Sequence, residues 1–356
     1  MILNKLNHSH LPCLPLLRRG PGGGRTAVAF LAAWFIVCGN LSARTITDMA
    51  GRKVNVPDRI TRIIPYDNKT NLLLFPVAGE KLAAKAWWAR ESYFRYISKE
   101  WLKLREIDTR NAEEVIKLHP DVIVVGSFLD DRATIENYVA FARKVNIPLV
   151  IVDLHLMHLD RTVDFLGNLL DRPKEAKACS DYIRSVYKGI EELVKNPAAK
   201  KRVYMANDPN GLRTAPNASL HAELFDIMQL ENVAKTALDA NGFALVSIEQ
   251  VMMWNPEYVF CVGKGEASPY RAVLKSALWR TITAVKEKKV FFVPCNPYSW
   301  FDIPPSLNRL MGLVWFSQIF YDQPEEVTKQ KVIEFYRLFY KYKLSDKEYS
   351  QLFKWS

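Results

Sequence analysis

Cysteine is scarce in this sequence, with 5 in 356 residues, and long apolar runs are missing. Two of the five cysteines precede residue 44, and the other three, Cys179, Cys261 and Cys295, are far apart and odd in number. At least one thiol therefore stays unpaired in a monomer, so stability must come from hydrophobic cores and not from disulfides. No stretch after residue 43 is long and apolar enough to span a bilayer as a helix.

Signatures of enzymes and of nucleic-acid binding are missing as well. The sequence has no Gly-x-Ser-x-Gly elbow, phosphate-binding glycine loop, His-Glu-x-x-His or Cys-x-x-Cys. Its basic residues are scattered among acids and form no long run that could follow a phosphate backbone. We therefore expect neither an enzyme, nor a resident cofactor, nor a nucleic-acid partner. A two-lobed α/β metalloenzyme stays as the alternative of another class.

The first 43 residues have the layout of a secretory signal peptide. Four basic residues precede an acid-free apolar run at residues 27–38, and the segment ends in Leu41-Ser42-Ala43. We expect cleavage after Ala43 and a periplasmic location. A lipoprotein anchor at Cys38 is disfavoured, because bulky Val37 precedes it. Removal of the four basic residues lowers the formal net charge from +11 to +7, and a positive field favours anionic ligands or surfaces.

One pattern occurs twice, at residues 111–125 and 247–261. Each copy reads as an N-capping Asn or Ser, a short helix with an early acid, a proline stop and a β-rich buried run. A basic lead-in to a strand precedes each copy, at residues 59–64 and 200–205. A wholly apolar strand is typical of a parallel sheet that is buried on both faces. The pattern predicts an α/β fold of two lobes, each with a central, mostly parallel sheet flanked by helices.

Residues 173–194 predict one long helix between the lobes. Its apolar stripe at helical spacing consists of Ala176, Cys179, Ile183, Val186, Tyr187, Ile190 and Val194. Such a helix is a stiff connector that limits how far the lobes can swing. We expect a signal peptide at 1–43, an N-terminal lobe at 44–170, the connecting helix at 171–200 and a C-terminal lobe at 201–356. The last lobe is expected to end in two amphipathic helices, at 306–321 and 325–342, and a short helix from 346.

The opening residues 45–64, with Gly51 at a turn and Pro57 before a strand, resemble the start of a known family. This is the helical-backbone (class III) family of periplasmic binding proteins of ABC importers, which bind iron-siderophores, haem and cobalamin. Further segments are similar to the family, in the family's order: 112–126, 219–223 with 232–234, 246–249 with 254–256, and 284–294.

The resemblance implies a monomeric protein that captures a small molecule in an interlobe cleft and delivers it to an ABC permease and its ATPase. An anionic metal chelate of the iron-siderophore type is the first candidate. Residues 210–214 and 302–309 look like a branch that handles ferric chelates, molybdate-type oxoanions or nickel complexes. A molybdate or tungstate oxoanion, or a nickel or corrinoid complex, therefore stays open as the ligand.

Docking on the permease is expected to depend on acids. The family carries one early in the helix after the first strand, and here Lys69-Thr70-Asn71 stands in its place. Glu223 matches the corresponding acid of the second lobe. The resemblance implies that Glu223 is exposed on the rim and docks, with Glu80 as a substitute on the first lobe.

Ligands of open α/β sheets bind beyond the carboxyl ends of the strands, so the loops at these ends supply the candidate ligand-binding residues. These are Tyr66, Asn68, Trp87, Trp88, Arg90, Ser127 and His155 on the first lobe, and Arg213, Tyr298, Trp300 and Asp302 on the second. Guanidinium groups pair with the oxygens of an anion, and rings cover an apolar face. We expect the two sets to face each other across a solvent-filled groove.

His155 and His158 are also candidates for a metal site, because two neighbouring imidazoles can ligate an exposed metal ion. A solvated or helix-capping pair is the alternative. For His221 both a place in the cleft and packing beneath the Glu223 helix stay open.

Overall fold

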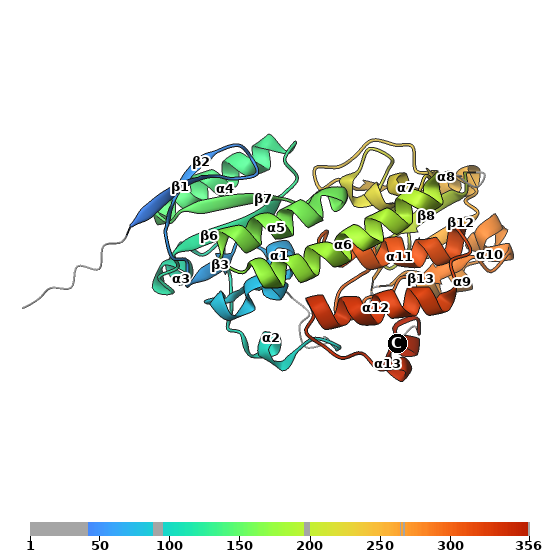
Figure 1. Ribbon diagram of the computed structural model, residues 1–356. Coiled ribbons are helices and arrows are strands. Elements are labelled where there is room, and N and C mark those ends of the chain that lie inside the picture. Colours follow the sequence, from blue (N-terminus) through green and yellow to red (C-terminus); the bar gives the residue numbers. More distant parts are fainter. Residues whose placement is uncertain (1–41, 88–94, 196–199, 264, 266–267, 355–356) are drawn as a thin grey trace, which may run out of the picture. The chain divides into compact units, whose positions relative to one another are not determined.

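Two separate parallel sheets, each flanked by helices, organise the computed structural model, which describes residues 42–87, 95–195, 200–263, 265 and 268–354 (Figure 1). The predicted α/β class with two lobes and a connecting helix is confirmed. None of the helices in these residues has the length and apolar character needed to cross a membrane.

The first sheet has the strand order β3-β6-β7, and all its strands are parallel. Its strands are β3 (Ile63–Pro65), β6 (Val122–Ser127) and β7 (Leu149–Asp153), and the short parallel pair β4 (Lys85–Ala86) and β5 (Glu106–Ile107) lies beside it. Every residue of β6 and β7 is buried, as expected for apolar strands that helices cover on both faces.

An antiparallel hairpin of β1 (Ala43–Thr47) and β2 (Lys53–Pro57) is fastened to the edge of this sheet. The Asp48 carboxylate at its turn accepts a hydrogen bond from the backbone N–H of Ile151 in β7, at 3.2 Å. The helices of this lobe are α1 (Asn68–Ala78), α2 (Lys99–Lys103), α3 (Ala112–Lys117), α4 (Arg132–Val145) and α5 (Leu159–Leu169), with the 3-10 turns η1 (Gly79–Lys81) and η3 (Leu156–His158).

The second sheet has the order β10-β8-β12-β13 and is also parallel throughout. Its strands are β8 (Arg202–Ala206), β10 (Glu231–Asn232), β12 (Tyr258–Cys261) and β13 (Val290–Phe292), next to an antiparallel ribbon of β9 (Arg213–Thr214) and β11 (Ala244–Leu245). The helices and turns around it are η4 (Leu220–Ala222), α7 (Glu223–Ile227), α8 (Ile248–Trp254), α9 (Tyr270–Lys275), η6 (Trp279–Thr281) and α10 (Thr283–Lys286).

The repeated sequence pattern builds the same unit in both lobes. Asn111 caps α3 before β6, and Ser247 caps α8 before β12, in each case by accepting backbone N–H hydrogen bonds of the first turn. The acid after the proline then ties the unit to the neighbouring strand. Asp121 accepts from the backbone of Thr61 and Arg62 ahead of β3, and Glu257 accepts from the backbone of Arg202 at the start of β8. The pattern thus places one interior strand in each sheet.

The connecting helix α6 (Pro173–Val194) buries the predicted apolar stripe except for Val194, which is partly buried. It packs on α1 and α5 of the first lobe and on α11 (Arg309–Phe320) and α12 (Glu325–Phe339) of the second. α13 (Asp346–Leu352) follows with a capping box at Ser345. The expectation of an amphipathic helix at 306–321 is wrong, because α11 is buried on nearly all sides from Arg309 to Ser317. The domain boundaries stay a prediction.

Two glycines in helices predict opposite responses to alanine. A methyl group at Gly312 in α11 would overlap the Leu224 side chain and the carbonyl oxygen of Trp300, whereas one at Gly189 in α6 meets no atom within 4 Å. We expect Gly312→Ala to lower the free energy of unfolding by about 1–3 kcal/mol through overpacking. Gly189→Ala is expected to raise it by about 0.5–1 kcal/mol, because alanine is the better helix former. Urea denaturation of both variants tests this, and equal effects would show that α11 is less tightly enclosed than described.

Candidate functional site

The carboxyl ends of β6 and β7 lie side by side, since Ser127 pairs with Asp153 in the parallel register. The backbone N–H of Leu154 donates to the carbonyl of Ser127 at 3.0 Å, and the Phe128 ring contacts the His155 ring edge-on at 5.3 Å. This edge is where ligands bind in open α/β sheets. Ser127 itself is buried, so His155 is the predicted residue that this edge presents to solvent.

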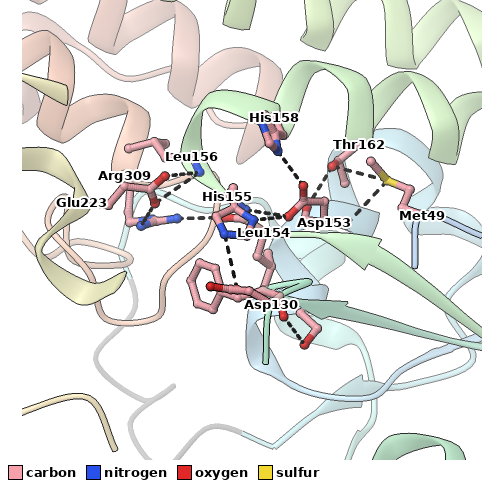
Figure 2. A network of polar contacts seen from close by, with 12 residues as sticks. Met49, Asp130, Asp153, Leu154, His155, Leu156, His158, Thr162, Glu223 and Arg309 are labelled. Atoms are coloured by element: carbon pink, nitrogen blue, oxygen red, sulfur yellow. Dashed lines mark hydrogen bonds and ion pairs between the residues drawn. The ribbon is translucent and has the colours of Figure 1, made fainter. Parts of the chain in front are cut away.

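Asp153, the last residue of β7, holds two histidines (Figure 2). Its Oδ1 lies 2.6 Å from Nδ1 of His155, and its Oδ2 lies 2.6 Å from Nδ1 of His158. The aspartate side chain is nearly buried, whereas the side chains of His155 and His158 are 24% and 45% exposed. One buried carboxylate therefore orients two partly exposed imidazoles.

The charge of Asp153 is stabilised despite its burial. Desolvation raises the pKa of this carboxyl, but hydrogen bonds from the backbone of His155 and from the rings of His158 and His155 outweigh that effect. The net pKa of Asp153 lies below its ordinary value of 3.8. The site therefore keeps a fixed negative charge at the end of β7.

A second network lies on the other side of the same segment, residues 153–158 (Figure 2). The buried guanidinium of Arg309 in α11 pairs with Glu223 of α7 at 2.8 Å and donates to the carbonyl of Leu154 at 2.9 Å. The Glu223 carboxylate also accepts from the backbone N–H of Leu156 at 3.0 Å. This pair thus joins two elements of the second sheet's lobe to the chain that leaves β7.

The expectation that Glu223 is exposed on a rim is wrong. Its side chain is only 18% exposed, because Arg309 and the Leu156 N–H occupy its oxygens. On the first lobe, the side chain of Asn71, which stands where the family has an acid, makes two hydrogen bonds with the backbone of Ala86, both at 3.0 Å. Glu80 is accessible and pairs with Arg172 at 2.6 Å, so its docking role stays a prediction.

The second lobe presents a stack of rings and charges at its own strand ends. His221 contacts the Asp302 carboxylate through Nδ1 at 2.6 Å and the carbonyl of Asn241 through Nε2 at 3.1 Å. Its ring stacks on Phe243 at 4.4 Å, and the guanidinium carbon of Arg213 lies 4.2 Å from the centre of the Phe243 ring. Packing beneath the Glu223 helix does not describe His221, which belongs to this stack. Asp302 acts here by orienting His221.

Tyr298 and Trp300 do not face a solvent-filled groove, so this expectation is wrong. Both side chains are buried in the largest hydrophobic core. The Tyr298 ring contacts Tyr340, and the Trp300 ring contacts Trp315 and Phe353. The C-terminal helical region covers this aromatic loop, a packing partner that the sequence analysis did not identify.

The remaining candidates of the first lobe have different surroundings. Tyr66 packs edge-on against Tyr138 and Phe141 of α4, Asn68 begins α1, and Trp87 is 58% exposed. Trp88 and Arg90 lie outside the described residues. The roles of these side chains in ligand binding stay a prediction.

Sequence reasoning missed Asp130, Asp153, Phe243 and Arg309 as parts of the site. The spacing Asp-x-His-x-x-His at 153–158 was a signal for the first network, because an acid at a strand end reaches side chains of the following turn. Arg309 is the single charged residue at positions 309–321, and a charge that becomes buried requires a partner.

Glu223→Gln is expected to lower the free energy of unfolding by about 3–5 kcal/mol, because it leaves the buried guanidinium of Arg309 without a counter-charge. The double variant Glu223→Met, Arg309→Met removes both charges and is expected to cost less than the single change. Asp181→Asn, in the exposed pair with Lys177, is the control and should cost at most about 1 kcal/mol. If urea denaturation gives the same small loss for Glu223→Gln, the pair does not hold this segment.

Comparisons with known proteins agree with this architecture. Residues 71–297 match the model of a family described as periplasmic binding protein. The molybdate-binding protein MolA of Haemophilus influenzae is 26% identical over 345 residues, which cover 85% of this chain and 92% of that protein.

Two solved structures share the fold. A solute-binding protein of an ABC transporter from Sulfurospirillum deleyianum has a TM-score of 0.77 at 23% identity, over 87% of this chain and 99% of that one. MolA of H. influenzae bound to molybdate has a TM-score of 0.67 at 21% identity, over 85% and 99%. These relatives are binding proteins that serve transport and are not enzymes. The chain belongs to the periplasmic binding protein family, as a solute-binding protein of an ABC importer.

Proposed function

We propose that this protein captures an anionic ligand and delivers it to the permease and ATPase of an ABC importer. Its family supports an extracytoplasmic binding role. Export by a signal peptide cleaved after Ala43, a monomeric state and docking through Glu80 belong to the same proposal.

The proposal rests on the way neighbouring rings orient the Arg213 side chain. The Arg213 side chain is 36% exposed. Its guanidinium lies over the Phe243 ring, and the Phe243 ring stacks on the His221 ring. Asp239 lies 3.7 Å from it, at the limit of an ion pair. Stacking fixes the plane of the guanidinium, so less rotamer freedom is lost when its N–H groups bind oxygens of an anion. Such a pre-oriented fork is suited to a carboxylate, a catecholate or an oxoanion.

An anionic metal chelate of the iron-siderophore type is the first candidate. The exposed ring of Trp87 and the partly exposed ring of Phe128 offer apolar surface for the organic part of such a ligand. The stack of the second lobe supplies the positive charge. A haem or corrinoid would use the same two features, with a larger apolar face.

A molybdate-type oxoanion is the second candidate, favoured by the sequence similarity to MolA over most of both chains. A compact oxoanion needs N–H donors more than apolar surface, and Arg213 supplies them in either case. The two candidates therefore share the dependence on Arg213 and differ in the contribution of the rings.

Arg213→Ala is expected to weaken ligand binding tens- to thousands-fold, which corresponds to about 2–5 kcal/mol for an arginine that pairs directly with a desolvated anion. Isothermal titration calorimetry with ferric citrate and with sodium molybdate measures this loss and shows which probe binds. Arg337→Ala, at an exposed position of α12, is the matched control and should bind as the unaltered protein does. Unchanged affinity in Arg213→Ala would contradict an anionic ligand.

A further inference from the structure

Both ring nitrogens of His155 face carboxylate oxygens. Nδ1 lies 2.6 Å from Asp153 Oδ1, and Nε2 lies 3.5 Å from Asp130 Oδ1. A neutral imidazole has one N–H and one lone pair, so it can donate to only one of the two acids. The other nitrogen then turns its lone pair toward a negative oxygen. A metal ion bound at one nitrogen would give both nitrogens a favourable partner.

The surrounding groups match the requirements of a metal ion. One ligand atom each from Asp153, His155 and His158 can be chosen so that all three lie within 4.8 Å of one another. Asp153 contributes one carboxylate, and Asp130, whose side chain is exposed, contributes a second next to His155. Two carboxylates and two imidazoles have the net charge that compensates a divalent cation.

We propose that Asp153, His155 and His158 bind a divalent transition metal ion through one carboxylate oxygen and the two Nδ1 atoms. In this arrangement Nε2–H of His155 donates to Asp130, which acts as a positioning residue. A carboxylate behind a metal-bound histidine fixes its tautomer and ring orientation in this manner. The conflict at His155 is thereby removed, because each nitrogen has a partner of the right kind.

Only a small movement of the rings is needed. Ligands about 2.1 Å from a tetrahedral ion lie roughly 3.4 Å apart, so the imidazole that contacts the ligating oxygen has to move outward by about 0.8 Å from its present 2.6 Å contact. The other imidazole now contacts the second oxygen of the same carboxylate and has to turn toward the ion. Both rings are partly exposed, whereas Asp153 is fixed at the end of β7. Imidazole ligands favour Ni²⁺, Cu²⁺ or Zn²⁺ over Mg²⁺ or Ca²⁺.

Three protein ligands leave a tetrahedral ion one open position, which a donor atom of a bound solute can fill. The metal site deepens the proposed function and rests on it for this role: the metal ion held by the first lobe binds a donor atom of the solute, while Arg213 recognises the negative charge of the solute. The metal site itself can be tested with bare ions.

The test is a titration of the tag-free protein with Ni²⁺ and Zn²⁺, with Mg²⁺ as the comparison ion. We expect one Ni²⁺ or Zn²⁺ per chain and no Mg²⁺. His158→Ala removes a ligand and should weaken Ni²⁺ binding more than 10-fold, and Asp130→Asn, which alters only the supporting acid, by about 10- to 100-fold. His119→Asn is the control, because His119 is an exposed histidine with φ 46°, a conformation that asparagine tolerates.

A second measurement uses the unaltered protein and so does not depend on whether the variants fold. The electron paramagnetic resonance spectrum of the unaltered protein with one equivalent of Cu²⁺ should show coupling to two imidazole nitrogens. Absence of stoichiometric binding, a spectrum without nitrogen coupling, or an equal loss in His119→Asn overturns the metal site. These results leave anion capture intact, since that function is tested separately by Arg213→Ala with molybdate and ferric citrate.

Discussion

The buried guanidinium of Arg309 is the constraint on which the centre of this structure depends. A charge removed from water costs several kcal/mol unless a counter-charge and hydrogen-bond acceptors surround it. Glu223 supplies the counter-charge, and the carbonyl of Leu154 supplies an acceptor. Because Glu223 also binds the N–H of Leu156, the requirements of one arginine determine the position of residues 153–158 relative to α7 and α11.

Residues 153–158 therefore serve two purposes. Their backbone belongs to the Arg309–Glu223 network, and their side chains orient two imidazoles at the carboxyl end of β7. The Tyr187 hydroxyl of α6 donates to the carbonyl of Leu156, so the connecting helix contacts the same segment. His155 lies between Leu154 and Leu156, whose backbone groups bind Arg309 and Glu223. A ligand that contacts His155 therefore lies close to the contacts between the lobes. This proximity gives a physical route from solute binding to the relative position of the lobes, which the stiff helix α6 restrains.

Much of the fold could be predicted from sequence, because its signals are local. The capping residues Asn111 and Ser247, the proline stops and the apolar strands each act within about fifteen residues, and they produced the units that the structure contains. The apolar stripe of α6 could be predicted equally well, since helical periodicity depends on residue spacing alone.

The site was harder to predict, because its decisive partners are distant in sequence. Glu223 was expected at the surface, but its partner Arg309 is 86 residues away. Trp300 was expected to contact a ligand, and it is buried because the C-terminal residues Trp315 and Phe353 pack on it. The Asp153 network consists of residues that are near neighbours in sequence. Asp153 itself was missed because it was taken only as the last residue of a strand. The orientation of Arg213 depends on Phe243, which is distant in sequence. Pairing of β9 with β11 brings the two residues together.

Native mass spectrometry of the protein isolated from its own periplasm tests the central claim most directly, because it shows the solute that the cell supplies. The account predicts one bound species per chain that carries negative charge and contains a metal atom, either as a chelate or as an oxoanion. A neutral organic molecule without metal, bound in the same one-to-one ratio, would contradict it.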